Sequence, residues 1–357
     1  MTTHAVVLLF SAAVVSHARP QAAQTRQVRC EVIVSPSDTD SWRFSAVAPG
    51  PGGLLAWTDG RSGQFSVRDP LGRVRSIGRQ GAGPGEFQAI GAMDWLGDSL
   101  WVADGLLPRV QVFSDTGRFL GVITATRPAG WGLTRAGSLV GFGGVPLGRD
   151  VPFAVLSYTP KATTVDTVGV FQLVPAERFA LPPRMALNKQ PLLPETVVGW
   201  NASHDRFCGA TPAGTGQIRV RCLDGRGVVV VDRSVPLEPR PLTNAIYDDV
   251  IKAWARGPER SEAVMRDLIR RPRVLPLALE LKVENEGGIW LRRTHASEPV
   301  AVWARLRSDG SLREQVQMPR GFNLLRVGAD ALWATSADAD GLQTLHVCTP
   351  VAQPAGH

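Results

Sequence analysis

A short pattern of residues recurs along this chain and limits its fold more than any other feature. In each copy a Gly or Asp precedes a few aliphatic residues, often with a Trp, and a polar turn follows. Six stretches carry the pattern, namely GGLLAWTDG (52–60), GDSLWVADG (97–105), AGSLVGFGG (136–144), HDRFCGATP (204–212), EGGIWLRRT (286–294) and GADALWATS (328–336). Runs with alternating apolar residues follow most copies, such as RVQVFSD at 109–115. This alternation between turn residues predicts antiparallel β-hairpins.

Six units of this kind predict an all-β fold, a six-bladed β-propeller whose blades are four-stranded antiparallel sheets. Trp57, Trp101, Trp290 and Trp333 stand at matching places in their units. We expect these side chains to fill the wedges between neighbouring blades, because large aromatic rings bury much apolar surface there. A sugar-binding platform is the alternative role for them.

Residues 78–123 resemble one family more closely. The segment holds GAGPGEF at 81–87, LWVAD at 100–104, RVQVF at 109–113 and DTG at 115–117. This order of parts resembles an NHL repeat, and the whole chain resembles exported, TolB-like bacterial propellers. GAGPGEF has no Lys and no third Gly in place for a phosphate-binding loop. Pro84 and Gly85 instead predict the two central positions of a type II turn, with Phe87 entering the core behind them.

Two connections are longer than a propeller blade needs, and they lie at 171–196 and 240–275. The first is rich in Pro. In the second, Ile246, Val250 and Ile251 follow helical spacing, Thr243 can cap the helix, and Gly257–Pro258 interrupt it. We therefore expect a short helical insertion between blades 4 and 5, at about 243–271. Both insertions join the last strand of one blade to the first of the next, so both should decorate the same face.

The ends of the chain are expected to close the ring together. Runs at 322–328, 331–336 and 342–348 supply three strands of the last blade, and 28–34 can supply the fourth. This places Cys30 beside Cys348 and predicts a disulfide between them. Cys208 and Cys222 should face each other across a hairpin and form the second disulfide. No CxxC pair occurs, so a zinc site is not expected.

The N-terminus favours export. Ala5 to Val15 is almost entirely apolar, which suits a signal-peptide core and is too short to span a bilayer. A buried first strand or helix is the alternative. We predict a signal peptide at 1–18, a flexible linker at 19–27, the propeller at 28–350 and a disordered tail at 351–357. The expected location is periplasmic or extracellular, without a transmembrane segment, and the protein is expected to be a monomer.

The net charge of +7 allows a nucleic-acid partner, but the basic residues are spread out without a cluster or interleaved aromatics. RNA binding, known for some NHL propellers, therefore stays a minor alternative, and export argues against it.

Signatures of common enzymes are absent from the sequence, which has no GxxxxGK[ST], HExxH or GxSxG motif and only scattered His residues. The propellers that the chain resembles include calcium-dependent lactonases and a zinc-dependent lyase. The metal-binding residues of neither group can be identified in this sequence. Polar residues near the expected inner strands are interpreted as turn or strand-end residues rather than ligands, and they are Asp94, Asn201, Glu284 and Asn323. We expect no cofactor, no metal and no catalytic residue.

The function predicted from these features is that of a non-enzymatic, exported propeller. It would bind a protein, peptide or glycan partner on the face that carries the two insertions, partly lidded by 243–271. Candidate binding residues on that face are Arg79, Glu86, Arg109, Arg292 and His295. The alternative is a metal-dependent propeller enzyme of the lactonase or lyase type.

Overall fold

The computed structural model describes residues 24–38, 43–58, 63–124, 129–133, 139–142, 153–158, 165–171, 174, 177–181, 186–201, 204–296 and 298–352. The expected signal peptide at 1–18 and the residues after Ala352 in the expected tail lie outside these ranges. Strands dominate the described chain, with few helices, so the expected all-β class is confirmed in this coarser form.

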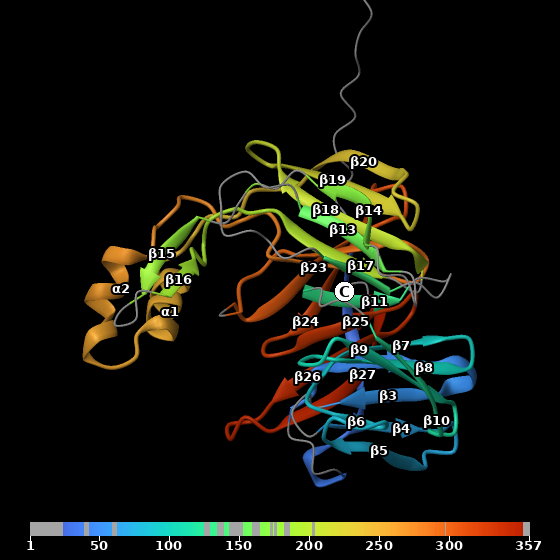
Figure 1. Cartoon of the computed structure of the whole chain (residues 1–357). Helices are drawn as coiled ribbons and strands as arrows, with labels where there is room; N and C mark the ends of the chain where they lie inside the picture. Colours follow the sequence, from blue (N-terminus) through green and yellow to red (C-terminus); the bar gives the residue numbers. More distant parts are fainter. Residues whose placement is uncertain are drawn as a thin grey trace, which may run out of the picture.

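Four of the sheets follow the sequence in order (Figure 1). The first contains β2 (Ala46–Pro49), β3 (Leu55–Thr58), β4 (Gln64–Arg68), β5 (Val74–Gln80) and the short β6 (Glu86–Phe87). The second contains β7 (Ile90–Leu96), β8 (Ser99–Asp104), β9 (Arg109–Ser114) and β10 (Phe119–Thr124). The third contains β11 (Ala129–Leu133), β12 (Leu139–Phe142), β13 (Phe153–Tyr158) and β14 (Val165–Phe171). The fourth contains β17 (Val197–Asn201), β18 (Arg206–Pro212), β19 (Gln217–Asp224) and β20 (Val229–Pro236).

The largest sheet has eight strands, which differs from the expected separate four-stranded blades. Its order is β21 (Glu280–Val283), β22 (Ile289–Arg292), β23 (Val300–Leu306), β24 (Leu312–Pro319), β1 (Gln24–Val34), β27 (Gln343–Ala352), β26 (Leu332–Ala337) and β25 (Asn323–Val327). The cause is the length of β1. It pairs antiparallel with β27, and its first four residues also pair in parallel with β24. Residues 24–27, expected in a flexible linker, are therefore part of a strand.

The sheets surround one central cavity, which makes the fold a propeller. One edge strand of each of four sheets, β2, β7, β17 and β21, lines this cavity, and so does β25 at the other edge of the eight-stranded sheet. Neighbouring inner strands pack side by side, β2 with β7, β7 with β11, and β17 with β21. The ring closes because β25 packs against both β2 and β21. Side chains directed into the cavity thus come from segments far apart in the sequence.

Apolar residues between the sheets form the core. Trp57 and Trp290 are fully buried, as expected for residues that fill wedges between blades. Trp101 and Trp333 are only partly buried, and each lines a cavity instead.

The two long insertions fold together into a small lobe beside the sheets (left in Figure 1). The second insertion forms α1 (Asn244–Trp254) and α2 (Glu262–Leu268), and the side chains of Thr243 and Ser261 cap their first turns. A short 3-10 turn, Pro258–Arg260, separates the helices; others lie at Pro36–Asp38 and Pro51–Gly53. The first insertion forms a hairpin that the Pro-rich sequence did not predict, with strands β15 (Arg178–Leu181) and β16 (Ala186–Lys189).

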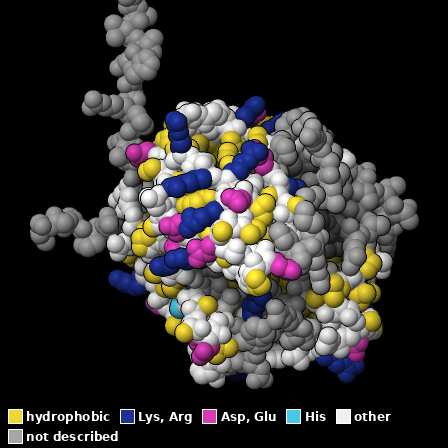
Figure 2. All heavy atoms as spheres, turned by 90° about the vertical axis from the view of Figure 1, so that its left-hand side faces the viewer, with side chains coloured by type: hydrophobic (Ala, Val, Ile, Leu, Met, Phe, Trp, Pro, Cys, Tyr) yellow, Lys and Arg dark blue, Asp and Glu magenta, His cyan; other side chains and the backbone are white. Residues whose placement is uncertain are grey.

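A shared core holds the lobe together. Phe179 and Leu192 of the first insertion pack with Tyr247, Ile251 and Met265 of the second. Basic, acidic and apolar side chains are interspersed on the side of the molecule that carries the lobe (Figure 2).

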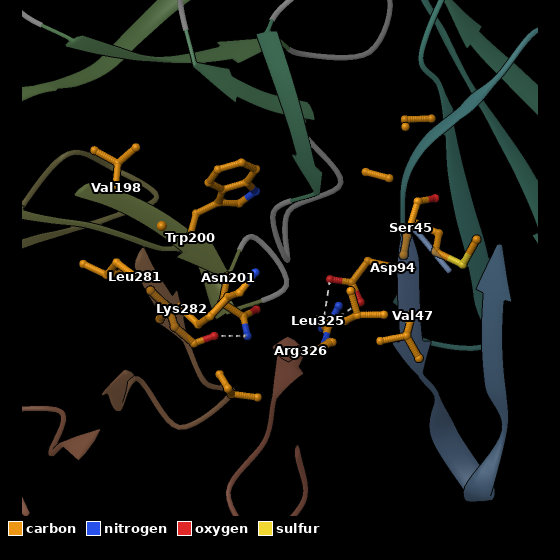
Figure 3. A pocket seen from close by; sticks show the side chains of 18 of the residues that line it. Ser45, Val47, Asp94, Val198, Trp200, Asn201, Leu281, Lys282, Leu325 and Arg326 are labelled. Carbon is orange, nitrogen blue, oxygen red and sulfur yellow. Dashed lines mark hydrogen bonds and ion pairs between the residues drawn. The ribbon is translucent and has the colours of Figure 1, made fainter. Parts of the chain in front are cut away.

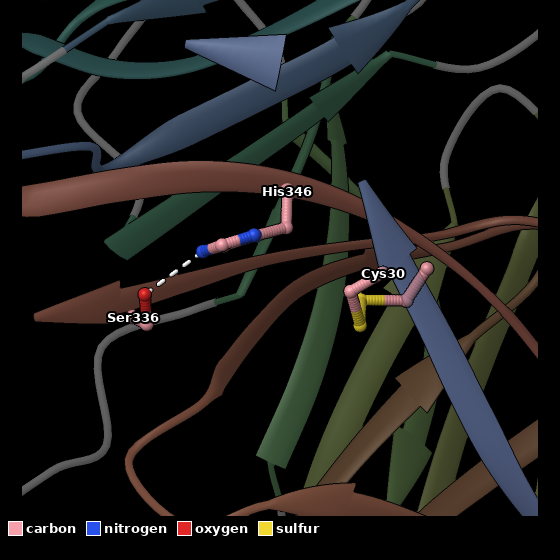
Figure 4. Close-up of a disulfide and its surroundings, with 4 residues drawn as sticks. Cys30, Ser336 and His346 are labelled. Carbon is pink, nitrogen blue, oxygen red and sulfur yellow. Dashed lines mark hydrogen bonds between the residues drawn. A yellow bond between two sulfur atoms is a disulfide. The ribbon is translucent and has the colours of Figure 1, made fainter. Parts of the chain in front are cut away.

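Two disulfides join the expected cysteines, Cys30 with Cys348 (Figure 4) and Cys208 with Cys222. Disulfides persist in oxidising compartments, so they favour a location outside the cytoplasm. Neither α1 nor α2, the α-helices of the described chain, has the length and apolar character needed to span a bilayer.

Candidate functional site

The central cavity has a volume of about 390 Å³, within the range of small-molecule sites. Its wall is built by strands, in which alternate residues point to opposite sides. All four residues of β21 contribute to the cavity lining, but Leu281 and Val283 are buried in the core, while Glu280 and Lys282 are only partly buried. On β7, Met93 and Trp95 are buried, and the partly buried Asp94 between them lines the cavity together with Met93. The alternation of the strands therefore supplies charged groups to an interior space.

An ion pair from two different sheets lies at the cavity wall (Figure 3). Nη2 of Arg326 on β25 donates to both carboxylate oxygens of Asp94 on β7, at 3.0 and 3.1 Å. The side chains are 17% and 16% exposed, so water screens this pair less than it would a surface pair. Asp94 Oδ1 also accepts a hydrogen bond from the backbone N–H of Trp95. The carboxylate is thereby held in one orientation.

A second acid and base lie together on β21. Nζ of Lys282 is 2.9 Å from Oε1 of Glu280, and Nη1 of Arg292 lies 3.8 Å from the other oxygen of Glu280. In the close view, Lys282 and Trp200 lie on the side of the cavity opposite Asp94 and Ser45 (Figure 3). Each of the two sides of the cavity thus carries one carboxylate paired with a basic side chain, Asp94 with Arg326 and Glu280 with Lys282.

Amide and aromatic side chains complete the wall. Asn201, at the end of β17, donates to the Asn285 side chain at 2.9 Å and to the Val283 carbonyl at 3.3 Å. Its side-chain oxygen lies 3.2 Å from Nδ1 of His204. Trp200 and Trp101 add aromatic surface. A ligand here would meet charged, amide and aromatic groups together.

The donor set of the cavity does not fit a metal ion. The described residues contain no group of three or more His, Cys, Asp or Glu side chains that could hold one. Both oxygens of Asp94 face Arg326, and Glu280 faces Lys282, so positive charge already occupies the positions that a cation would need. Of the four polar residues noted in the sequence, Asp94 and Asn201 line the cavity, whereas Glu284 and Asn323 do not.

Three of the five expected binding residues are used to build the GAGPGEF loop. Arg79 pairs with Glu86 at 2.6 Å, and the other oxygen of Glu86 accepts from the backbone N–H of Gly83 at 2.8 Å. This hydrogen bond and then the Arg79 guanidinium hold the pKa of Glu86 below its usual range. Arg109 donates to the backbone carbonyls of Ala82, Gly83 and Glu86. Through these contacts the three side chains stabilise the conformation of the loop.

The same loop contains the turn that the sequence predicts. The backbone N–H of Glu86 donates to the Gly83 carbonyl at 3.1 Å, across Pro84 and Gly85. Gly85 has φ +75°, the left-handed conformation that the second central position of a type II turn requires. Phe87 is fully buried behind it.

The other two expected residues lie near the cavity and the base of the lobe. Arg292 donates to the Thr294 carbonyl, in addition to its contact with Glu280. The backbone N–H of His295 donates to Glu298, which binds Arg240 at the base of the lobe. Burial, and then the charge of Arg292, lowers the pKa of His295. The structure thus brings Arg292 and His295 close to each other, and Arg79, Glu86 and Arg109 together in the GAGPGEF loop.

Sequence reasoning missed Lys282, Arg326 and Trp200 as cavity residues. A signal was present for Lys282, because Glu280 and Lys282 alternate with the apolar Leu281 and Val283. No such signal exists for Arg326, since an irregularity in the pairing of β25 between Leu324 and Arg326 shifts the side-chain alternation.

No family model and no curated protein matches the chain. Solved propeller structures do match. A protein described as exported, from Bacteroides fragilis, is 12% identical over 92% of this chain and 99% of that chain, with a TM-score of 0.48. A gluconolactonase from Xanthomonas campestris is 11% identical over 91% and 90%, with a TM-score of 0.40. Virginiamycin B lyase from Staphylococcus aureus is 9% identical over 91% and 100%, with a TM-score of 0.43.

Enzymes predominate among the matched structures. This finding contradicts the expectation that the chain is a non-enzymatic protein binding a protein, peptide or glycan partner. Likeness at such low identity does not transfer the activity of any neighbour to this chain. A function must therefore be argued from the cavity itself.

Proposed function

We propose that the chain is a propeller enzyme that acts on the carbonyl group of a small molecule in the central cavity, as a lactone hydrolase or a lyase. The observation that carries this proposal is the pair Asp94–Arg326, an acid and a cation from different sheets at the wall of an interior cavity. A site with this composition can take up a proton and stabilise negative charge at the same time.

Each group has a defined part in either reaction. Asp94 accepts a proton, from an attacking water in lactone hydrolysis or from the carbon next to the carbonyl in a lyase reaction. Arg326 and Lys282 stabilise the negative charge that develops on the carbonyl oxygen. The leaving oxygen then takes a proton from the same carboxyl group. Trp200 supplies an apolar wall that excludes water from part of the substrate.

Because the donor set does not fit a metal, no step of this proposal uses one. The positive charges that stabilise an oxyanion come from Arg326 and Lys282. Both side chains are held by their carboxylate partners, so little reorganisation is needed when charge develops.

The test uses the full chain and substitutes Asp94→Asn, which preserves shape and removes the base. A panel of lactones and of substrates that can undergo β-elimination is screened for turnover. We expect the wild type to convert one class, and Asp94→Asn to lower kcat by about 100-fold or more. Asp98→Asn is the matched control, since Asp98 is exposed in the turn after the same strand. Turnover that survives in Asp94→Asn would contradict the assignment, as would a wild type inert toward the whole panel.

We further propose that the ring has six four-stranded blades. On this interpretation the eight-stranded sheet counts as two blades, β21–β24 and β25–β27 with β1, joined by the parallel contact of β1 with β24. The resemblance of 78–123 to an NHL repeat supports this proposal. The two disulfides support secretion to the periplasm or medium after removal of residues 1–18, which N-terminal sequencing of the mature protein tests.

A further inference from the structure

A second cavity, also of about 390 Å³, lies at the seam where the ring closes. One wall comes from the β2–β3 turn and the end of β4, and the other from β1, β26 and β27 of the eight-stranded sheet. It shares no lining residue with the central cavity. The proposed enzymatic function makes no use of this space.

The walls of the second cavity are mainly apolar. Ile33, Leu54, Leu55, Trp333 and Val347 line it, and all but Leu55 retain some exposure. Ile33, Leu55 and Trp333 also belong to, or pack against, the apolar cluster between the first sheet and the last strands. An apolar group entering the cavity would thus extend an existing core.

The polar end of this cavity carries one available charge. Both carboxylate oxygens of Asp69 already have partners. One accepts hydrogen bonds from the backbone N–H groups of Leu71 and Arg73, and the other binds Nε of Arg73 at 2.6 Å. Arg68, next to it, is half-buried, and its guanidinium makes no hydrogen bond or ion pair with any residue in the described ranges. Arg68 thus brings to the cavity lining a positive charge that has no carboxylate partner among the described residues.

An apolar cavity with a single unpaired guanidinium is complementary to one chemical class of ligand. We propose that this seam binds an amphipathic small carboxylate. The apolar body of the ligand packs on Trp333, Leu55 and Val347, and its carboxylate forms a bidentate pair with Arg68.

The experiment titrates the full chain with decanoate and follows binding by calorimetry and by Trp fluorescence. Decanol, which has the same chain without the charge, is titrated in parallel. We expect saturable binding of decanoate, and binding of decanol weaker by about 10- to 100-fold, as the loss of a charged hydrogen-bonded pair predicts. Equal affinity for the two ligands overturns the proposal, and so does the absence of saturable decanoate binding.

Two variants locate the site. Arg68→Gln should weaken decanoate by about 10- to 100-fold and leave decanol unchanged, whereas Val347→Phe should weaken both by filling the cavity. Arg29→Gln is the control, because Arg29 is an exposed arginine on β1 that does not line the cavity. Each variant is first shown to unfold at the wild-type temperature. Decanoate affinity that is unchanged in both Arg68→Gln and Val347→Phe would show that the ligand binds elsewhere and would refute the assignment.

Discussion

Cys30 on β1 lies directly opposite Cys348 on β27, and the disulfide between them joins the first described strand to the last one. These two residues are 318 positions apart, whereas Cys208 and Cys222 are 14 apart. The first bridge therefore closes the ring, and the second crosses a single hairpin. Both strands of each pair are also hydrogen-bonded, so the bridges reinforce pairings that already exist.

Removing the ring-closing bridge should destabilise the protein more than removing the hairpin bridge. In the loop-entropy description the cost is about 6 kcal/mol for Cys30→Ser with Cys348→Ser, and about 3 kcal/mol for Cys208→Ser with Cys222→Ser, both as upper bounds. Chemical denaturation of the two double variants gives the free energies of unfolding. A lower free energy of unfolding for the Cys208/Cys222 variant than for the Cys30/Cys348 variant would contradict the prediction.

A buried ionic network at the junction of β1, β23 and β24 leads to a second prediction. Arg305 is 4% exposed and binds Glu284 at 2.9 Å and Glu314 at 3.0 Å. Arg26 of β1 binds the other oxygen of Glu314 at 2.8 Å. Replacing one partner of such a buried network leaves uncompensated charge in the interior, which is far more costly than losing a surface pair.

We expect Arg305→Met to lower the free energy of unfolding by about 3 to 5 kcal/mol. Arg313→Met is the control, because Arg313 contacts the same Glu314 at 3.7 Å from a side chain that is 46% exposed. Its loss should cost under about 1 kcal/mol. Denaturant unfolding gives the free energy of unfolding of each variant. A similar loss in both variants would contradict the prediction that the buried network contributes more.

Stability should fall on acidification because of His295 and His346. Burial lowers the pKa of both in the folded protein, and the Arg292 charge lowers that of His295 further. The unfolded chain binds these protons near about pH 6.5, so below that pH it carries more protons than the folded chain. The contribution of the neutral histidines is therefore fully present above the unfolded pKa, and it is lost as the pH falls toward the lowered folded values.

Unfolding measured at about pH 7 and about pH 5.5 should show this loss, and His295→Gln with His346→Gln should make the change smaller. Carboxyl groups such as Asp232, whose pKa is lowered by its hydrogen bond from Arg219, keep their full stabilising contribution at these pH values and lose it only below about pH 4. They do not interfere in this range. An equally steep pH dependence in the double variant would assign the effect to other groups.

The sequence predicted the strands, the helices and the disulfides better than it predicted the site. Cys30, Cys348 and Thr243 act locally, through strand pairing and helix capping, and such local rules can be applied to a sequence. The fused sheet was not predicted, because the parallel contact of β1 with β24 depends on where the two strands meet in space. Asp94 was seen, but its partner Arg326 is 232 residues away and follows an irregular step in β25. The sequence therefore showed an isolated acid, while the structure shows an ion pair.

The expected binding residues on the GAGPGEF loop stay a prediction, but the structure gives their side chains contacts that the sequence did not show. They were expected to bind a ligand because they lie on the face that carries the two insertions. In the structure, Arg79, Glu86 and Arg109 make hydrogen bonds and an ion pair within the loop itself. A loop with several glycines has many unpaired backbone groups, and these side chains satisfy them.

The lobe supplies the last prediction, since two insertions depend on each other for their core. The Gln190 side chain accepts from the Arg270 backbone N–H at 3.0 Å and donates to the Leu268 carbonyl at 2.9 Å, which joins the insertions directly. Each insertion leaves the sheets through a narrow base. Thr196 bonds to Val174 at the first base, and Leu242 donates to the Arg273 carbonyl at the second.

Excising 243–271 alone should therefore expose Phe179, Leu181 and Leu192 of the remaining hairpin, and the protein should self-associate. Excising 175–195 as well removes these residues and should restore the oligomeric state of the wild type, because both cuts fall at bases whose ends are already hydrogen-bonded. Light scattering coupled to gel filtration measures the mass of each variant, and binding of a hydrophobic dye reports the exposed surface. A single excision that keeps the wild-type mass and binds no dye would show that the hairpin is stable without the helices, which would contradict the shared core.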